Sequence, residues 1–230
     1  MKTEPPLRGI SSMATRALLA QLSALFEQGG GPPVSIESVG GVDAVRRVQA
    51  GEDFDLVILA ADAIERLIDQ GQLLTGRVDL ARSGVAAAVR QGAAVPDFSS
   101  VDSLRRAVLE APRIGYSTGP SGVALLELFK RWGVHEALAP RLLQAPAGVP
   151  VAALVARGDV ALGFQQLSEL IDMPGITLVG PLPAAVQITT VFSAGIGVRS
   201  RQIEAARACL SFMAGPQAVD AKRKQGMDAA

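Results

Sequence analysis

A repeated succession of strand and helix patterns over residues 7–70 narrows the choice of fold more than any other property of this 230-residue chain. Its centre is Asp55–Ala60, a nearly unbroken apolar run of strand length. Strands of this kind are buried on both faces, as in parallel sheets covered by helices. Around it the sequence predicts strands at Leu7–Ser12 and Val34–Val39, and helices at Met13–Glu27, Val42–Ala50 and Asp62–Gln70. Alternating strands and helices predict a doubly wound α/β unit.

The rest of the chain continues the alternation. Two stretches stand out by length, the apolar run Val78–Arg90 and the extended segment Gln187–Gly197. The other predicted helices are Ser100–Glu110, Val123–Arg131, Val149–Arg157, Arg201–Met213 and Pro216–Gln225, and the other predicted strands are Arg113–Ser117, Val160–Phe164, Ile176–Val179 and Val186–Val191. A chain of this length forms one large domain or two smaller ones, each with its own core.

Composition narrows the functional classes. The 22 Lys and Arg residues balance the 22 Asp and Glu residues, so no net field attracts nucleic acid or an anionic membrane surface. Cys209 and His135 are the single residues of their types. One cysteine cannot form an intrachain disulfide. One cysteine and one histidine also disfavour a metal centre and a Ser/His or Cys/His nucleophile. We therefore expect no nucleic-acid partner, no metal and no cofactor.

The first residues bear on the location of the protein. Met1–Pro6 lacks the positive segment and apolar core of a signal peptide, and no apolar run reaches transmembrane length. We expect no membrane insertion. The chain as given is expected in the cytoplasm, or in the periplasm if a leader was removed.

Small or polar residues stand repeatedly between a predicted strand and a predicted helix. These turns are Ser11-Ser12, Gly40-Gly41, Ser121-Gly122 and Gly148-Val149. In open α/β sheets ligands bind at the carboxyl ends of strands, where helix N-termini offer free N–H groups and the positive end of the helix dipole. The pattern predicts an anion site lined by backbone. The alternative for Ser11 and Ser12 is that they only cap the first helix.

Four collinear stretches resemble a known family. They are Gly9–Leu18, Gln49–Asp62, Ala81–Arg90 and Leu210–Pro216 with Gly226-Met227. Together they resemble the periplasmic molybdate-binding proteins of ABC transporters, which have the type II periplasmic-binding-protein fold. The resemblance implies two α/β lobes, each a mixed sheet flanked by helices, joined by two crossover segments and closing on the ligand by hinge motion. Lobe 1 would comprise residues 1–81 plus 186–230, and lobe 2 residues 82–185.

The resemblance also implies a set of ligand contacts. In the family, two serine hydroxyls, backbone N–H groups and a tyrosine hydroxyl hold the oxyanion. By position these fall at Ser12, at Gly40-Gly41, at Ser121-Gly122 and Val149, and near Gln165. The second serine and the tyrosine are therefore missing here, while Gly40 and Gly41 still offer backbone N–H groups.

These departures shift the expected ligand from molybdate towards an organic carboxylate. The amide of Gln165 or Gln166 donates and accepts, which suits a carboxyl or hydroxyl group. Arg82, at the predicted lobe boundary, would supply a bidentate clamp for a carboxylate. The alternative for Arg82 is an ordinary surface arginine.

Three functions are compatible with these features. The first is a binding protein for a small oxyanion or organic carboxylate, with an ABC permease as partner if the protein is exported. The alternative is an isomerase of an unsaturated carboxylic acid, such as aconitate, on the same scaffold. Its few acid/base candidates are Tyr116, Asp43, Asp62 and a serine. A ligand sensor acting through a separate partner is the third.

Overall fold

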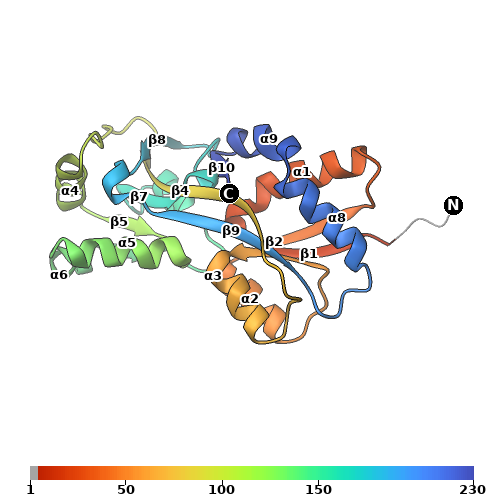
Figure 1. The fold of residues 1–230 in the computed structure, drawn as a ribbon. Coiled ribbons are helices and arrows are strands. Elements are labelled where there is room, and N and C mark those ends of the chain that lie inside the picture. The colour runs from red at the N-terminus through yellow and green to blue at the C-terminus, as the bar shows by residue number, and fades with distance from the viewer. Residues whose placement is uncertain (1–4) are drawn as a thin grey trace. The chain divides into compact units, whose positions relative to one another are not determined.

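The computed structural model describes residues 5–230, and Figure 1 shows the order of its elements. The chain divides into two compact units. Unit 1 contains the chain up to Arg82 together with Val191–Ala230, and unit 2 contains Ser83–Thr190. The chain passes between the units within two long strands, β4 (Val78–Arg90) and β9 (Thr189–Ile196).

Unit 1 is built on a mixed sheet with the strand order β2-β1-β3-β9. Strand β1 (Leu7–Ser12) lies parallel to β2 (Val34–Val39) and to β3 (Leu56–Ala60), and β9 lies antiparallel to β3. The other elements of unit 1 are α1 (Arg16–Gln28), α2 (Gly41–Gln49), α3 (Ala61–Asp69), α8 (Ile203–Ala214), α9 (Val219–Lys224), β10 (Met227–Ala229) and two 3-10 turns, Met13–Thr15 and Pro216–Ala218. Helices α2 and α3 begin within two residues of the ends of β2 and β3, whereas the 3-10 turn Met13–Thr15 separates β1 from α1.

Side chains of β3 enter two different cores, since successive residues of a strand point to opposite faces. Leu56 and Ile58 pack in the cluster that contains α1 and α8 residues, and Val57 and Leu59 pack in the cluster that contains α2 and α3 residues. Figure 1 shows these two pairs of helices on either side of the sheet. The prediction that Asp55–Ala60 contains a strand buried on both faces is therefore confirmed for Leu56–Ala60.

Unit 2 has a sheet of the same mixed kind, with the order β4-β7-β5-β6 and β8 paired to β4. Strand β5 (Ile114–Tyr116) is parallel to β6 (Leu142–Gln144) and β7 (Leu162–Gln166), whereas β4 is antiparallel to β7 and to β8 (Ile176–Pro181). The helices of unit 2 are α4 (Val101–Glu110), α5 (Pro120–Arg131), α6 (His135–Leu138), α7 (Val151–Arg157) and the 3-10 turns Ala139–Arg141, Leu167–Glu169 and Ala184–Val186.

Several predicted boundaries are wrong, and proline explains two of them. Helix α5 begins at Pro120, not at Val123, because proline is favoured in the first turn of a helix. Helix α7 begins at Val151, not at Val149, with Pro150 as its N-cap. The short elements β6 and α6 were not predicted, since three or four residues carry too little periodicity to be recognised.

Candidate functional site

The carboxyl ends of β1, β2 and β3 lie at one edge of the unit 1 sheet because the three strands are parallel. Ser12 ends β1 and is paired in register with Val39, the last residue of β2. Gly40 then serves as the N-cap of α2, and Ala60, at the end of β3, is the N-cap of α3. One edge of the sheet thus carries a serine hydroxyl between two helix N-termini.

The Ser12 hydroxyl has no hydrogen-bond partner within residues 5–230, although its oxygen is buried. Ser12 is the N-cap residue of the 3-10 turn before α1, yet its side chain makes no capping hydrogen bond. The interpretation of Ser12 as a helix cap by its side chain is therefore wrong. Ser11 differs, since its hydroxyl lies 2.8 Å from the hydroxyl of Ser38 and the residue is fully buried. Ser12 thus has the available hydroxyl, and Ser11 has a structural one.

The N-terminus of α2 adds backbone donors beside Ser12. No side chain caps this nine-residue helix, so the first-turn N–H groups that include Gly41 are open to a ligand. A methyl group placed on Gly41 would lie 3.9 Å from the Cβ of Ser12, which shows how near the two residues are. Glycine at this position keeps the backbone accessible next to the hydroxyl.

A second turn of this type lies in unit 2, at the start of α5. Gly119 is the N-cap of this 12-residue helix, and no side chain caps it. The hydroxyl of Ser121 lies 3.1 Å from that of Ser117, and Ser121 is buried. Gly122 packs so closely that a methyl group on it would overlap the carbonyl oxygen of Ser117. Its N–H donates to the Gly119 carbonyl at 3.0 Å, so Gly122 shapes the turn.

The structure places Val149 outside the helix that follows it. Its N–H donates to the Pro146 carbonyl at 3.0 Å in a turn. The N–H groups at the true start of α7, those of Val151 and Ala152, donate to the side-chain oxygen of Gln165 at 2.9 and 3.4 Å. A ligand role for Val149 stays a prediction.

Gln165 is a buried cap of α7, and this sets a limit on its predicted ligand role. Its oxygen accepts the two α7 donors, and its Nε2 donates to Oε1 of Glu169 at 2.8 Å. One amide hydrogen is left for another acceptor. The neighbouring Gln166 donates from Nε2 to the Thr190 hydroxyl at 2.7 Å, and its buried Oε1 has no partner among the described residues.

Glu169 is the residue of this network that sequence reasoning missed. It ends the 3-10 turn Leu167–Glu169 directly after β7. Burial raises the pKa of its carboxyl to about 7, and the hydrogen bond from Gln165 offsets that rise in part. No sequence pattern marks it, since a glutamate three residues after a strand is ordinary.

Arg82 is the last residue of the first segment of unit 1 and is an exposed residue of β4. No ion pair within residues 5–230 includes it. Its guanidinium is thus available, and its role as a carboxylate clamp stays a prediction.

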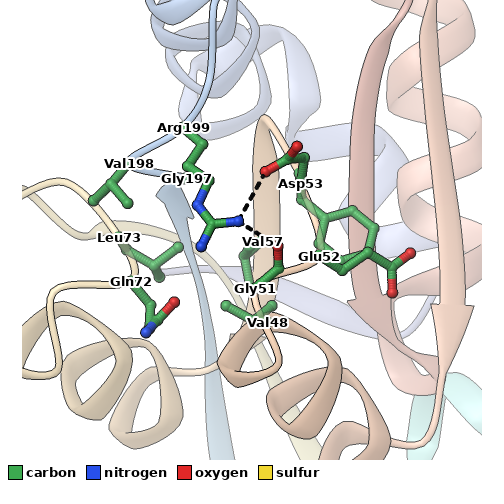
Figure 2. A pocket seen from close by; sticks show the side chains of 11 residues that line it. Val48, Gly51, Glu52, Asp53, Val57, Gln72, Leu73, Gly197, Val198 and Arg199 are labelled. Carbon is green, nitrogen blue, oxygen red and sulfur yellow. Dashed lines mark hydrogen bonds and ion pairs between the residues drawn. The ribbon is translucent and has the colours of Figure 1, made fainter.

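A separate pocket lies at the opposite edge of the unit 1 sheet. It is lined by residues after the C-terminal ends of α2, α3 and β9 and before β3, among them Gly51, Gln72 and Arg199. Figure 2 shows Arg199 directed at Gly51 and Asp53, where its Nη1 donates to the Gly51 carbonyl at 2.6 Å and lies 3.5 Å from the Asp53 carboxylate. Because helix N-termini are at the other edge, this pocket is distinct from the anion-type turns.

Within residues 5–230, no group of three or more His, Cys, Asp or Glu side chains is arranged to hold a metal ion. Over the same residues, no helix is long and apolar enough to cross a membrane.

Two α/β units, each with uncapped helix N-termini after strands, define a protein of the type II periplasmic-binding-protein class. The chain belongs to the family described as bacterial extracellular solute-binding proteins, whose family model matches residues 7–228. The predicted resemblance and the predicted fold class are confirmed, and the predicted function is confirmed at the level of a solute-binding protein.

Individual relatives differ in what they are named for. The chain is 39% identical, over 183 residues, to an aconitate isomerase from Pseudomonas sp., covering 79% of this chain and 70% of that protein. It superposes on the periplasmic molybdate-binding protein of Azotobacter vinelandii with a TM-score of 0.81, 22% identity and coverage of 96% and 98% of the two chains. The superposition on the sulfate-binding protein SubI of Mycobacterium tuberculosis has a TM-score of 0.76 and 16% identity, and it covers 97% of this chain and 86% of that chain. The two solved structures show a shared fold.

Proposed function

We propose that this protein binds a small organic carboxylate at the turns that follow its strands. The observation that carries the proposal is the buried hydroxyl of Ser12, which has no partner within residues 5–230, beside the N-terminus of α2, whose N-cap Gly40 has no side chain to cap it. Buried polar groups in proteins are nearly always hydrogen-bonded, so this hydroxyl is suited to meet a ligand. Backbone N–H groups at a helix start favour a negatively charged one.

A carboxylate is preferred over a tetrahedral oxyanion for two reasons. Gly40 and Gly41 stand where the family's second serine is implied, so that side-chain donor is missing. Glutamines stand where its tyrosine is implied, and an amide both donates and accepts. One relative is also named for aconitate, which is a tricarboxylate.

Isothermal titration against aconitate, citrate, sulfate and molybdate tests this proposal. We expect saturable heat with the carboxylates. Ser12→Ala should weaken that binding about tenfold or more, since a hydrogen bond to a charged group contributes about 1.5–3 kcal/mol. Ser23→Ala is the matched control, because the Ser23 hydroxyl in α1 is also buried and also lacks a partner among the described residues. Equal affinity of the two variants, or heat from molybdate alone, would contradict the proposal.

A second candidate function is isomerisation of an unsaturated tricarboxylate. The observation that favours it is the likeness to the relative named as an aconitate isomerase. Proton NMR of trans-aconitate with the purified protein tests it directly. Conversion to the cis isomer supports an enzyme, and unchanged trans-aconitate with normal binding heat identifies a receptor.

The family description supports a proposal for location and partner. Because the family is described as extracellular, we propose that the protein works outside the cytoplasmic membrane and delivers its ligand to an ABC permease. Cell fractionation and co-purification with a membrane permease test this. Recovery of all the native protein in the cytoplasmic fraction would contradict it and favour the predicted cytoplasmic location.

A further inference from the structure

Ligand binding alone gives no role to the carboxyl group of Glu169 in unit 2. The group is held in one place by a defined contact, because Nε2 of Gln165 donates to its Oε1 at 2.8 Å. Gln165 is fixed in turn, since its oxygen accepts the N–H groups of Val151 and Ala152. A carboxyl anchored through a buried amide to a helix start is positioned as a reacting group must be.

The turn that carries Glu169 packs on an apolar cluster. Leu170 belongs to that cluster together with Ala86 and Ala152, and Leu167 packs against it. Burial therefore raises the pKa of the carboxyl to about 7, which leaves both protonation states populated at neutral pH.

The charged side chains near Glu169 in the sequence are either paired with other residues or exposed to solvent. Arg157, at the far end of α7, donates to Asp159 at 2.9 Å. Asp172, in the turn after Glu169, is exposed. No ion pair within residues 5–230 includes Glu169, and the amide of Gln165 donates a hydrogen bond to its carboxyl.

Two of the acid/base residues predicted from sequence are already engaged in ion pairs. Asp43 forms one with Arg46 at 2.9 Å, and Asp62 forms one with Arg66 at 2.8 Å. Both pairs lie on the surface of their helices, where water surrounds them. A carboxyl that is half protonated near neutral pH serves better as a base and then as an acid.

We propose that Glu169 is the acid/base that moves the proton when an unsaturated tricarboxylate is isomerised, with Gln165 as its positioning residue. This inference rests on the second candidate function. The Glu169 carboxylate takes one proton from the methylene carbon of the substrate, and the electron pair spreads over the adjoining double bond. The same proton is then returned to the former vinyl carbon, so the double bond shifts and nothing is oxidised or reduced.

Three variants test the assignment in the full chain. In Glu169→Gln we expect kcat for trans-aconitate to fall about 10²–10⁴-fold, with Kd from titration changing less than about threefold. Glu110→Gln, an exposed glutamate at the end of α4 in the same unit, is the matched control and should keep full activity. Gln165→Met should move the break in the pH profile upward, because it removes the donor that favours the carboxylate.

The wild-type pH profile tests the proposal without relying on any variant's folding. We expect kcat/KM to rise through an ionisation near pH 7 as the base form appears. A profile flat from pH 5 to 9, or turnover by Glu169→Gln within threefold of wild type, would overturn the assignment while leaving the isomerase intact. A different result would overturn the isomerase candidate and this inference together. In it, the wild-type protein binds trans-aconitate but neither isomerises it nor exchanges its methylene protons with solvent.

Discussion

Ser11 and Ser12 are neighbours in sequence, but their hydroxyls lie in different environments. Successive side chains of β1 point to opposite faces, and the parallel register pairs Ser11 with Ser38 on β2, whose hydroxyl it meets. Ser12, one residue further, ends the strand and has no such partner among the described residues. The sequence alone marked both serines, since it shows the turn and not the register of the adjoining strand.

Gly122 offers a direct test of the unit 2 turn. In Gly122→Ala the added methyl group would overlap the backbone carbonyl of Ser117, so we expect the free energy of unfolding to fall by about 3 kcal/mol. Urea unfolding measures this. Gly119→Ala is the control, because nothing lies within 4 Å of its methyl position; equal losses in the two variants would contradict the close packing.

The raised pKa of Glu169 predicts how stability depends on pH. Glu169 has an ordinary pKa of 4.5 when unfolded and a pKa of about 7 in the folded protein. Between these pH values the folded state therefore holds a proton on Glu169 that the unfolded state has lost. Below pH 4.5 Glu169 should therefore not reduce the free energy of unfolding. Its contribution should lower that free energy as the pH rises to about 7 and stay constant at higher pH. Glu169→Gln should remove this loss, which is about 3 kcal/mol at most. Urea unfolding of both proteins at pH 5 and 8 checks it, and parallel pH slopes would contradict it.

At the scale of elements, α7 depends on a side chain that is distant in sequence. Gln165 of β7 accepts from Val151 and Ala152, and proline at the N-cap itself offers no side-chain oxygen. This long-range cap explains why helix start signals near Val149 misplaced the boundary. Because the sequence does not show this cap, Gln165 was predicted as a ligand contact. Most of its amide is in fact hydrogen-bonded to the start of α7 and to Glu169.

Replacing Gln165 should expose that dependence. Gln165→Met leaves two backbone donors of α7 and the Glu169 carboxyl without their partner, at an expected cost of about 1–3 kcal/mol. Urea unfolding again provides the measure. Gln144→Met, at the exposed end of β6, should change the free energy of unfolding by less than about 0.5 kcal/mol; a similar loss in both would contradict the capping role.

For the whole molecule, the alternation of strands and helices was sufficient to predict the α/β class and the family. Long strands such as β3 carry a strong hydrophobic pattern, so they were recognised, whereas the three-residue β6 was not. At the candidate site, Ser12 and the Gly40-Gly41 turn were visible as strand-end residues. Glu169 was not, because the pKa of its carboxyl is raised by burial in the folded protein, which no sequence pattern shows. The predicted hinge closure stays a prediction.

Mapping the ligand by NMR tests the central claim, that a small carboxylate binds at the carboxyl ends of the strands. With isotope-labelled protein and increasing trans-aconitate, we predict that the amide signals of Ser12 and Gly41 in unit 1 and Ser121 in unit 2 shift in a saturable way. Those of Gly51 and Arg199, at the pocket of Figure 2, should stay in place. Saturable shifts centred on Gly51 and Arg199, or no shifts at any of these residues, would contradict it.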